Sequence, residues 1–95
     1  MVIRREQRKL SEILQQVSAH LGFRVKTLRV KKGVSVTRLA HLLKVRQESV
    51  LAMEIGAREI KADELFAVAA VLDVEPAYFY EGLREALARS CRRLR

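Results

Sequence analysis

The chain has 95 residues, of which 49% are hydrophobic and 32% are charged, and its formal net charge is +8. This length predicts one domain, and the apolar share is too high for a disordered segment. A single cysteine, Cys91, cannot form an internal disulfide, which excludes a disulfide-stapled secreted scaffold. The charged amino end lacks the apolar run of a signal peptide, and no stretch is long enough for a membrane span. We therefore expect a soluble, cytoplasmic protein.

Helices dominate the predicted structure. With four Gly, one Pro and five aromatic residues, the composition favours an all-α domain, and the pattern predicts about seven helical segments and no strand. In residues 1–21, apolar side chains recur every three or four positions, which predicts an amphipathic helical extension. This stripe comprises Leu10, Ile13, Leu14, Val17 and Leu21.

The next segments are short and closely joined. Gly33 is placed to end one helix in the left-handed conformation, and Ser35 is a good N-cap for the next. Only Lys44 and Val45 separate that helix from a third, which ends at Gly56. Two short helices with a tight joint form a helix-turn-helix unit. The pattern predicts these helices over 21–32, from 36 to about 43, and from 46 or 47 to 55.

Three further helices are predicted in the second half. One begins near Asp63 and places Leu65, Phe66, Ala69 and Leu72 on its core side. Pro76 starts a short helix that includes Tyr78 and Phe79. The last, over 83–95, is amphipathic, with an apolar edge of Leu83, Leu87, Cys91 and Leu94.

Positive charge is concentrated in the predicted helix-turn-helix. Residues 21–56 carry eight basic and two acidic side chains, whereas residues 57–80 carry two basic and five acidic ones. A domain polarised in this way is suited to a polyanion. Basic charge alone also serves solubility and membrane surfaces, so it does not by itself identify nucleic acid.

Several local patterns carry a resemblance to a known family. They are Leu21, Gly22, Arg24, Val25, Leu28 and Arg29 in the first helix, Ser35, Leu39, Ala40, Leu43 and Val45 in the second helix and the turn after it, Gln47, Ser49, Val50, Glu54 and Gly56 in the third helix, and Leu65, Ala69, Leu72, Val74, Pro76 and Phe79 in the last two. With this spacing, residues 21–82 resemble the DNA-binding domain of the phage repressor and Cro type (XRE-like) of helix-turn-helix proteins, which is a compact five-helix fold. The resemblance therefore implies a lambda-repressor-like core at 21–82, with an extra amphipathic helix at each terminus, over 1–20 and 83–95.

The resemblance implies that the third helix lies in the major groove of DNA. It assigns base contacts to Gln47, Glu48, Ser49 and Ala52, and phosphate contacts to Arg38, Lys44, Arg46 and Arg58. Glutamine can pair with adenine through two hydrogen bonds, and glutamate can accept one from cytosine. Arg29 and Glu54 correspond to a salt bridge in the family, so we expect a structural role for them.

The sequence departs from the family pattern at five positions that are usually polar. They are Val36, Leu42, Leu51, Ala52 and Ile55. Exposed apolar side chains favour protein contacts, which supports an alternative function. In that alternative the fold is an interaction module that binds a protein partner through Val36, Leu42, Leu51 and Ile55, with only unspecific affinity for DNA.

The sequence carries no catalytic or cofactor signature. His20, His41 and Cys91 lack metal-ligand spacing, and we find no phosphate-binding glycine loop or nucleophile beside a histidine. We therefore expect no enzyme, no metal and no cofactor. The main prediction is a nucleoid-associated, dimeric repressor that binds an inverted-repeat operator, with terminal helices that dimerise. The resemblance leaves open whether it belongs to the restriction-modification controllers or the antitoxins.

Overall fold

The computed structural model describes residues 2–93 of the chain, and the side chains of residues 9–89. Within residues 2–93 every regular element is helical, which confirms the predicted fold class. No helix in this part of the chain is long and apolar enough to cross a membrane. The elements are α1 (Val2–Lys31), α2 (Val36–Leu43), α3 (Gln47–Glu54), α4 (Ala62–Leu72), the 3₁₀ helix η1 (Pro76–Tyr80) and α5 (Leu83–Arg93).

The first helix is continuous over 30 residues, so the predicted boundary between residues 20 and 21 was wrong and residues 2–93 form six helical segments. Gly22 lies inside α1 without ending it. A Cβ at this position would lie 2.2 Å from the carbonyl oxygen of Met53, so glycine allows α3 to pack closely against α1. Gly33, with a φ of 70°, follows the actual end of the helix in the left-handed conformation, as predicted.

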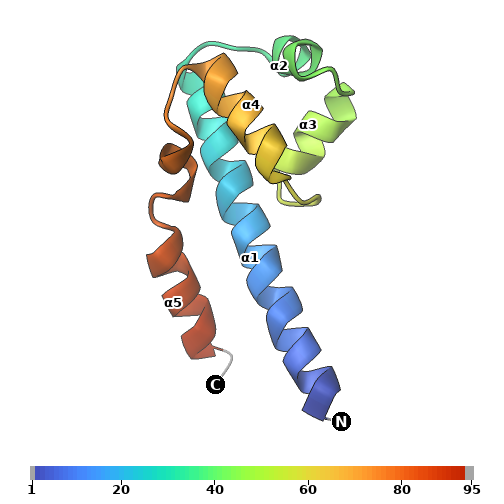
Figure 1. The fold of residues 1–95 in the computed structure, drawn as a ribbon, viewed down its shortest axis with the longest axis vertical. Coiled ribbons are helices and arrows are strands. Elements are labelled where there is room, and N and C mark those ends of the chain that lie inside the picture. Colours follow the sequence, from blue (N-terminus) through green and yellow to red (C-terminus); the bar gives the residue numbers. More distant parts are fainter. Residues whose placement is uncertain (1, 94–95) are drawn as a thin grey trace.

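The hydrophobic core lies where α2, α3 and α4 surround the second half of α1 (Figure 1). The contribution of α1 to the fully buried core begins at Leu21, although its described side chains begin at Lys9. The buried apolar residues are Leu21, Val25, Leu28, Leu39, Ala40, Val50, Met53, Ile60, Leu65, Val68, Ala69, Leu72 and Phe79. Within residues 9–20 of α1, the half-buried Val17 packs against this core, and no side chain is fully buried.

Phe66 is the clearest departure from the predicted core. Its side chain is 63% exposed, and Val68 takes the expected place on the buried side of α4. The buried residues of α4 are Leu65, Val68, Ala69 and Leu72, a pattern of i, i+3, i+4 and i+7. Phe66 follows Leu65 by one residue, which turns its side chain by about 100° away from the core.

The carboxyl-terminal helix α5 runs back along α1, so that the start of α1 and the end of α5 lie at the same end of the molecule (Figure 1). Arg24 of α1 stacks 4.0 Å from the ring centre of Tyr78 and donates to the Tyr78 carbonyl oxygen and to Glu81. His20 donates to the carbonyl oxygen of Glu81 at 2.7 Å. These contacts hold η1 and the start of α5 on α1.

The apolar edge of α5 is described only in part. Leu83 and Leu87 are half-buried, in agreement with the prediction. The side chain of Cys91, and Leu94, lie outside the described residues.

Candidate nucleic-acid interface

Two caps define α2, one at its start and one at its joint with α3. The Ser35 hydroxyl accepts from the backbone N–H of Arg38 at 3.0 Å, as its N-cap prediction requires. Lys44 adopts the left-handed conformation, with φ 59° and ψ 43°, and the Val45 N–H returns to the Ala40 carbonyl oxygen at 3.0 Å. This conformation costs a non-glycine residue about 1 kcal/mol. The strained joint directs α3 away from α2.

The exposed side of α3 carries the residues expected to contact bases. Gln47 and Glu48 form the first turn and are exposed, whereas Ser49 and Ala52 are half-buried. Val50 and Met53 face the core, with no exposed area. Gln47 and Glu48 thus offer hydrogen-bonding groups to a ligand outside the protein.

A buried ion pair joins α3 to α1. Arg29 donates through Nε to Glu54 Oε2 at 2.6 Å and through Nη2 to Glu54 Oε1 at 3.1 Å. The remaining Nη1 donates to the Val34 carbonyl oxygen at 2.8 Å, in the connection that leads to α2. The side chains of Arg29 and Glu54 are 11% and 2% exposed. The pair fixes the end of α3 against α1 and is structural.

Three exposed cations lie on α2 and on its connection to α3. Arg38 lies in the first turn of α2, Lys44 ends that helix, and Arg46 is the N-cap of α3. All three are exposed, and none has an ion-pair partner among the side chains of residues 9–89. Their charges lie close in sequence to Gln47 and Glu48, as a phosphate-contacting set would require.

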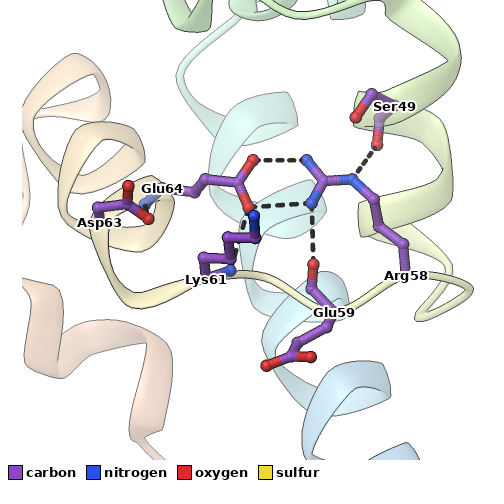
Figure 2. Close-up of polar contacts among 6 residues, drawn as sticks. All are labelled: Ser49, Arg58, Glu59, Lys61, Asp63 and Glu64. Carbon is purple, nitrogen blue, oxygen red and sulfur yellow. Dashed lines mark hydrogen bonds and ion pairs between the residues drawn. The ribbon is translucent and has the colours of Figure 1, made fainter.

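Arg58, the fourth expected phosphate contact, has partners within the protein (Figure 2). Its Nη1 and Nη2 donate to the two carboxylate oxygens of Glu64 at 2.9 and 2.8 Å. Its Nε donates to the Ser49 carbonyl oxygen at 3.3 Å, and Nη1 also donates to that of Glu59. Arg58 therefore ties α3 to the start of α4, and a phosphate would have to compete with Glu64 for it.

Glu64 is held in its charged form by this arrangement. The hydrogen bonds from Arg58 lower the pKa of Glu64 below its ordinary value, and the Lys61 N–H, which donates at 3.1 Å, adds to the effect. The same contact raises the pKa of Arg58. The pair thus stays ionised at neutral pH.

The apolar patch predicted from the sequence is smaller in the structure. Val36 is half-buried and packs against the core, so it is not part of an open surface. Leu42, Leu51 and Ile55 are exposed, as expected. Leu51 and Ile55 belong to α3 and its C-cap, which places them beside the polar residues of that helix.

Sequence reasoning did not find Gln15. Its Nε2 donates to the Gly56 carbonyl oxygen at 3.1 Å, directly after the end of α3. Gly56 has a φ of 75°, and a Cβ there would lie 2.8 Å from the Cα of Ala19. The extension of α1 therefore supports the end of α3. No local pattern reveals such a contact, because it joins residues 41 positions apart.

The chain is similar to several bacterial proteins of known sequence. It is 32% identical over 76 residues to the uncharacterized HTH-type transcriptional regulators RC0668 of Rickettsia conorii and RP497 of Rickettsia prowazekii. These alignments cover 80% of this chain, but only 61% and 58% of the two relatives. The chain thus spans about three fifths of the length of these curated relatives.

A solved structure is similar as well. The restriction-modification controller protein C.AhdI from Aeromonas hydrophila superimposes with a TM-score of 0.61 and 31% sequence identity. The superposition covers 64% of this chain and 92% of the controller protein.

The family model for the helix-turn-helix domain matches residues 25–79, which include the last seven residues of α1, the α2–α3 unit, α4 and most of η1. This match covers more than half of the chain and includes the buried pair of Arg29 and Glu54. It confirms the resemblance to XRE-like helix-turn-helix proteins. The chain belongs to the helix-turn-helix family of DNA-binding domains.

Proposed function

We propose that this protein is a sequence-specific DNA-binding transcriptional regulator that represses by occupying its operator. The observation that carries the proposal is the exposed first turn of α3, with Gln47 and Glu48, beside three exposed cations. Arg38, Lys44 and Arg46 supply phosphate contacts that position the domain, while base contacts provide specificity. Relatives named as transcriptional regulators, and the structural likeness to a controller protein, support the same function.

Base contacts are assigned to the exposed side of α3. The exposed Gln47 and Glu48 reach out to base edges in the major groove. Ser49 and Ala52 are half-buried, so they contact only bases that approach the surface of α3. Arg58 contributes to this site by holding α3 and α4 together, and it contacts phosphate less directly than the three exposed cations.

The decisive experiment is selection of bound duplexes from a random-sequence DNA pool. We expect an enriched sequence that binds at least ~10³-fold more tightly than scrambled DNA. Gln47→Ala should weaken binding to the enriched sequence by about 1 to 3 kcal/mol. It should also remove the preference for a particular base at one position of that sequence, and at that position only. Equal binding to all duplexes would contradict the proposal.

The phosphate contacts have a matched control. Lys44→Gln should weaken binding to every duplex and reduce the slope of log K against log salt by about one. Arg84→Gln removes the same charge from an exposed side chain of α5, which lies apart from α2 and α3 (Figure 1). This control should leave the salt slope almost unchanged. An equal loss in the two variants would show that only the total charge matters.

We propose that the active form is a homodimer built on the extension of α1. Leu10 and Leu14 are 57% and 58% exposed, one turn apart, and Leu14 borders a groove of about 450 Å³ that also includes Ile60 and Tyr80. A second copy would cover these side chains, and a two-fold dimer reads half-sites about 10 base pairs apart.

The dimer is tested by size-exclusion chromatography with light scattering at micromolar concentration. The wild type should have twice the mass of the chain, and Leu14→Ser should shift it towards the monomer. Phe66→Ser, which removes an equally exposed apolar side chain from α4, is the control and should remain dimeric. A monomeric wild type would refute this part of the proposal.

A further inference from the structure

The exposed side of α3 changes character along its length. Its first turn presents the polar groups of Gln47 and Glu48, but Leu51 and Ile55 are 49% and 71% exposed. Residues 47, 51 and 55 follow one another at intervals of four, so they lie along the same side of the helix. A ligand that lies along this side of α3 from Gln47 to its end therefore also meets two branched aliphatic side chains.

The main chain that carries these two side chains is well fixed. The Ile55 N–H donates to the Leu51 carbonyl oxygen at 3.2 Å, and Ile55 itself, with φ −94° and ψ 4°, continues near the helical path. The next residue, Gly56, is fixed by the hydrogen bond from Gln15 and by its close approach to Ala19. Binding thus needs little ordering of this end of α3.

In the major groove of DNA, the base edges offer one kind of apolar group that such side chains can contact. Base edges there present hydrogen-bond donors and acceptors, except for the C5 methyl group of thymine. A leucine or isoleucine beside another base edge would remove water from polar groups and leave them unpaired, which is unfavourable. Leu51 and Ile55 are separated by about 6 Å along the helix axis, close to two base-pair steps of about 3.4 Å each.

We propose that Leu51 and Ile55 read the C5 methyl groups of pyrimidines, so that the half-site carries thymine opposite the second half of α3. This inference rests on the proposed function and names the bases read at the same site. The exposed cations Arg38, Lys44 and Arg46 favour DNA over a protein as the partner of this surface. Cytosine methylated at C5 presents a methyl group at the equivalent place and substitutes for thymine.

The test compares thymine with uracil, which differ only by this methyl group. Duplexes enriched from the random pool are resynthesised with deoxyuridine at one thymine position at a time. At the positions read by Leu51 or Ile55, the wild type should lose about fourfold in affinity, which corresponds to about 0.8 kcal/mol for one buried methyl group. The Leu51→Ser variant should lose its sensitivity at one of these positions and keep it at the other.

Two controls separate the methyl contact from other causes. Deoxyuridine outside the half-sites should have no effect, and 5-methylcytosine should bind more tightly than cytosine at a sensitive position. If the wild type binds thymine and uracil duplexes equally, the inference is wrong while the proposed function stands. If the Leu51→Ser and Ile55→Ser variants lose as much affinity on replacement of thymine by uracil as the wild type does, the loss comes from a change in the DNA itself. The inference is then also wrong. If no sequence is enriched, the proposed function itself fails.

Discussion

The ion pair between Arg29 and Glu54 gives a sharp test of the fold. Replacing Arg29 with methionine keeps much of the apolar stem but removes all three hydrogen bonds made by the guanidinium. Both carboxylate oxygens of Glu54 then lose their partners, in a side chain that is only 2% exposed. A buried charge left alone in this way costs about 3 to 5 kcal/mol.

This loss is large for a domain of this size. The free energy of unfolding of small domains is about 5 to 15 kcal/mol, so Arg29→Met should leave a marginally stable protein. For a chain of this length, each 1 kcal/mol lowers the melting temperature by about 4 to 8 °C, which predicts a decrease of at least ~12 °C. Thermal and urea unfolding followed by circular dichroism at 222 nm measure it.

The double variant shows whether the buried charge is the cause. Arg29→Met combined with Glu54→Leu removes both charges, and it should recover most of the stability, because a well-packed apolar pair often matches a buried ion pair. A loss below about 1 kcal/mol in Arg29→Met, as for an exposed pair, would refute the argument. So would a double variant as unstable as the single one.

Three further predictions concern the elements around this pair. Glu64→Gln should cost about 1 kcal/mol at neutral pH. Because Arg58 lowers the pKa of Glu64 in the folded state, this carboxylate stabilises the fold above its unfolded pKa, near 4.5, and the contribution is lost as pH falls through the folded value. Melting temperatures at pH 7 and pH 3 should therefore differ less in Glu64→Gln than in the wild type, and an unchanged difference would contradict the role of this pair. Gly22→Ala should destabilise more than Gly33→Ala in urea unfolding, because an added Cβ meets backbone at the first position and open space at the second. Lys44→Gly should raise the melting temperature by relieving about 1 kcal/mol of left-handed strain, and a decrease would show that Lys44 makes a stabilising contact instead.

Much of the fold is encoded locally. Ser35 predicts the start of α2, Gly33 predicts the end of α1, and Pro76 predicts the start of η1, because capping and backbone preferences depend on neighbouring residues. The exposed positions of Gln47 and Glu48 follow from the period of α3 in the same way. The residues that carry the resemblance to helix-turn-helix proteins are also local patterns of caps and helical spacing.

The sequence predicts which positions belong to the site, but it does not predict the hydrogen-bond or ion-pair partner of each side chain. Arg38, Lys44, Arg46 and Arg58 look alike in the sequence, yet Arg58 alone of the four meets a carboxylate in the structure. That partner, Glu64, lies in the next helix, so the pairing depends on how the connection between α3 and α4 folds.

Sequence alone thus determined which segments are helical, where most of them are capped and where positive charge is concentrated, because these properties depend on residues close together in the chain. Only the tertiary structure decided that α1 continues through Gly22, that Phe66 faces outward and that Gln15 supports the end of α3. Each of these depends on the approach of elements distant in sequence. Burial and pairing are therefore set by packing, while helix formation and capping are set mainly by local preference.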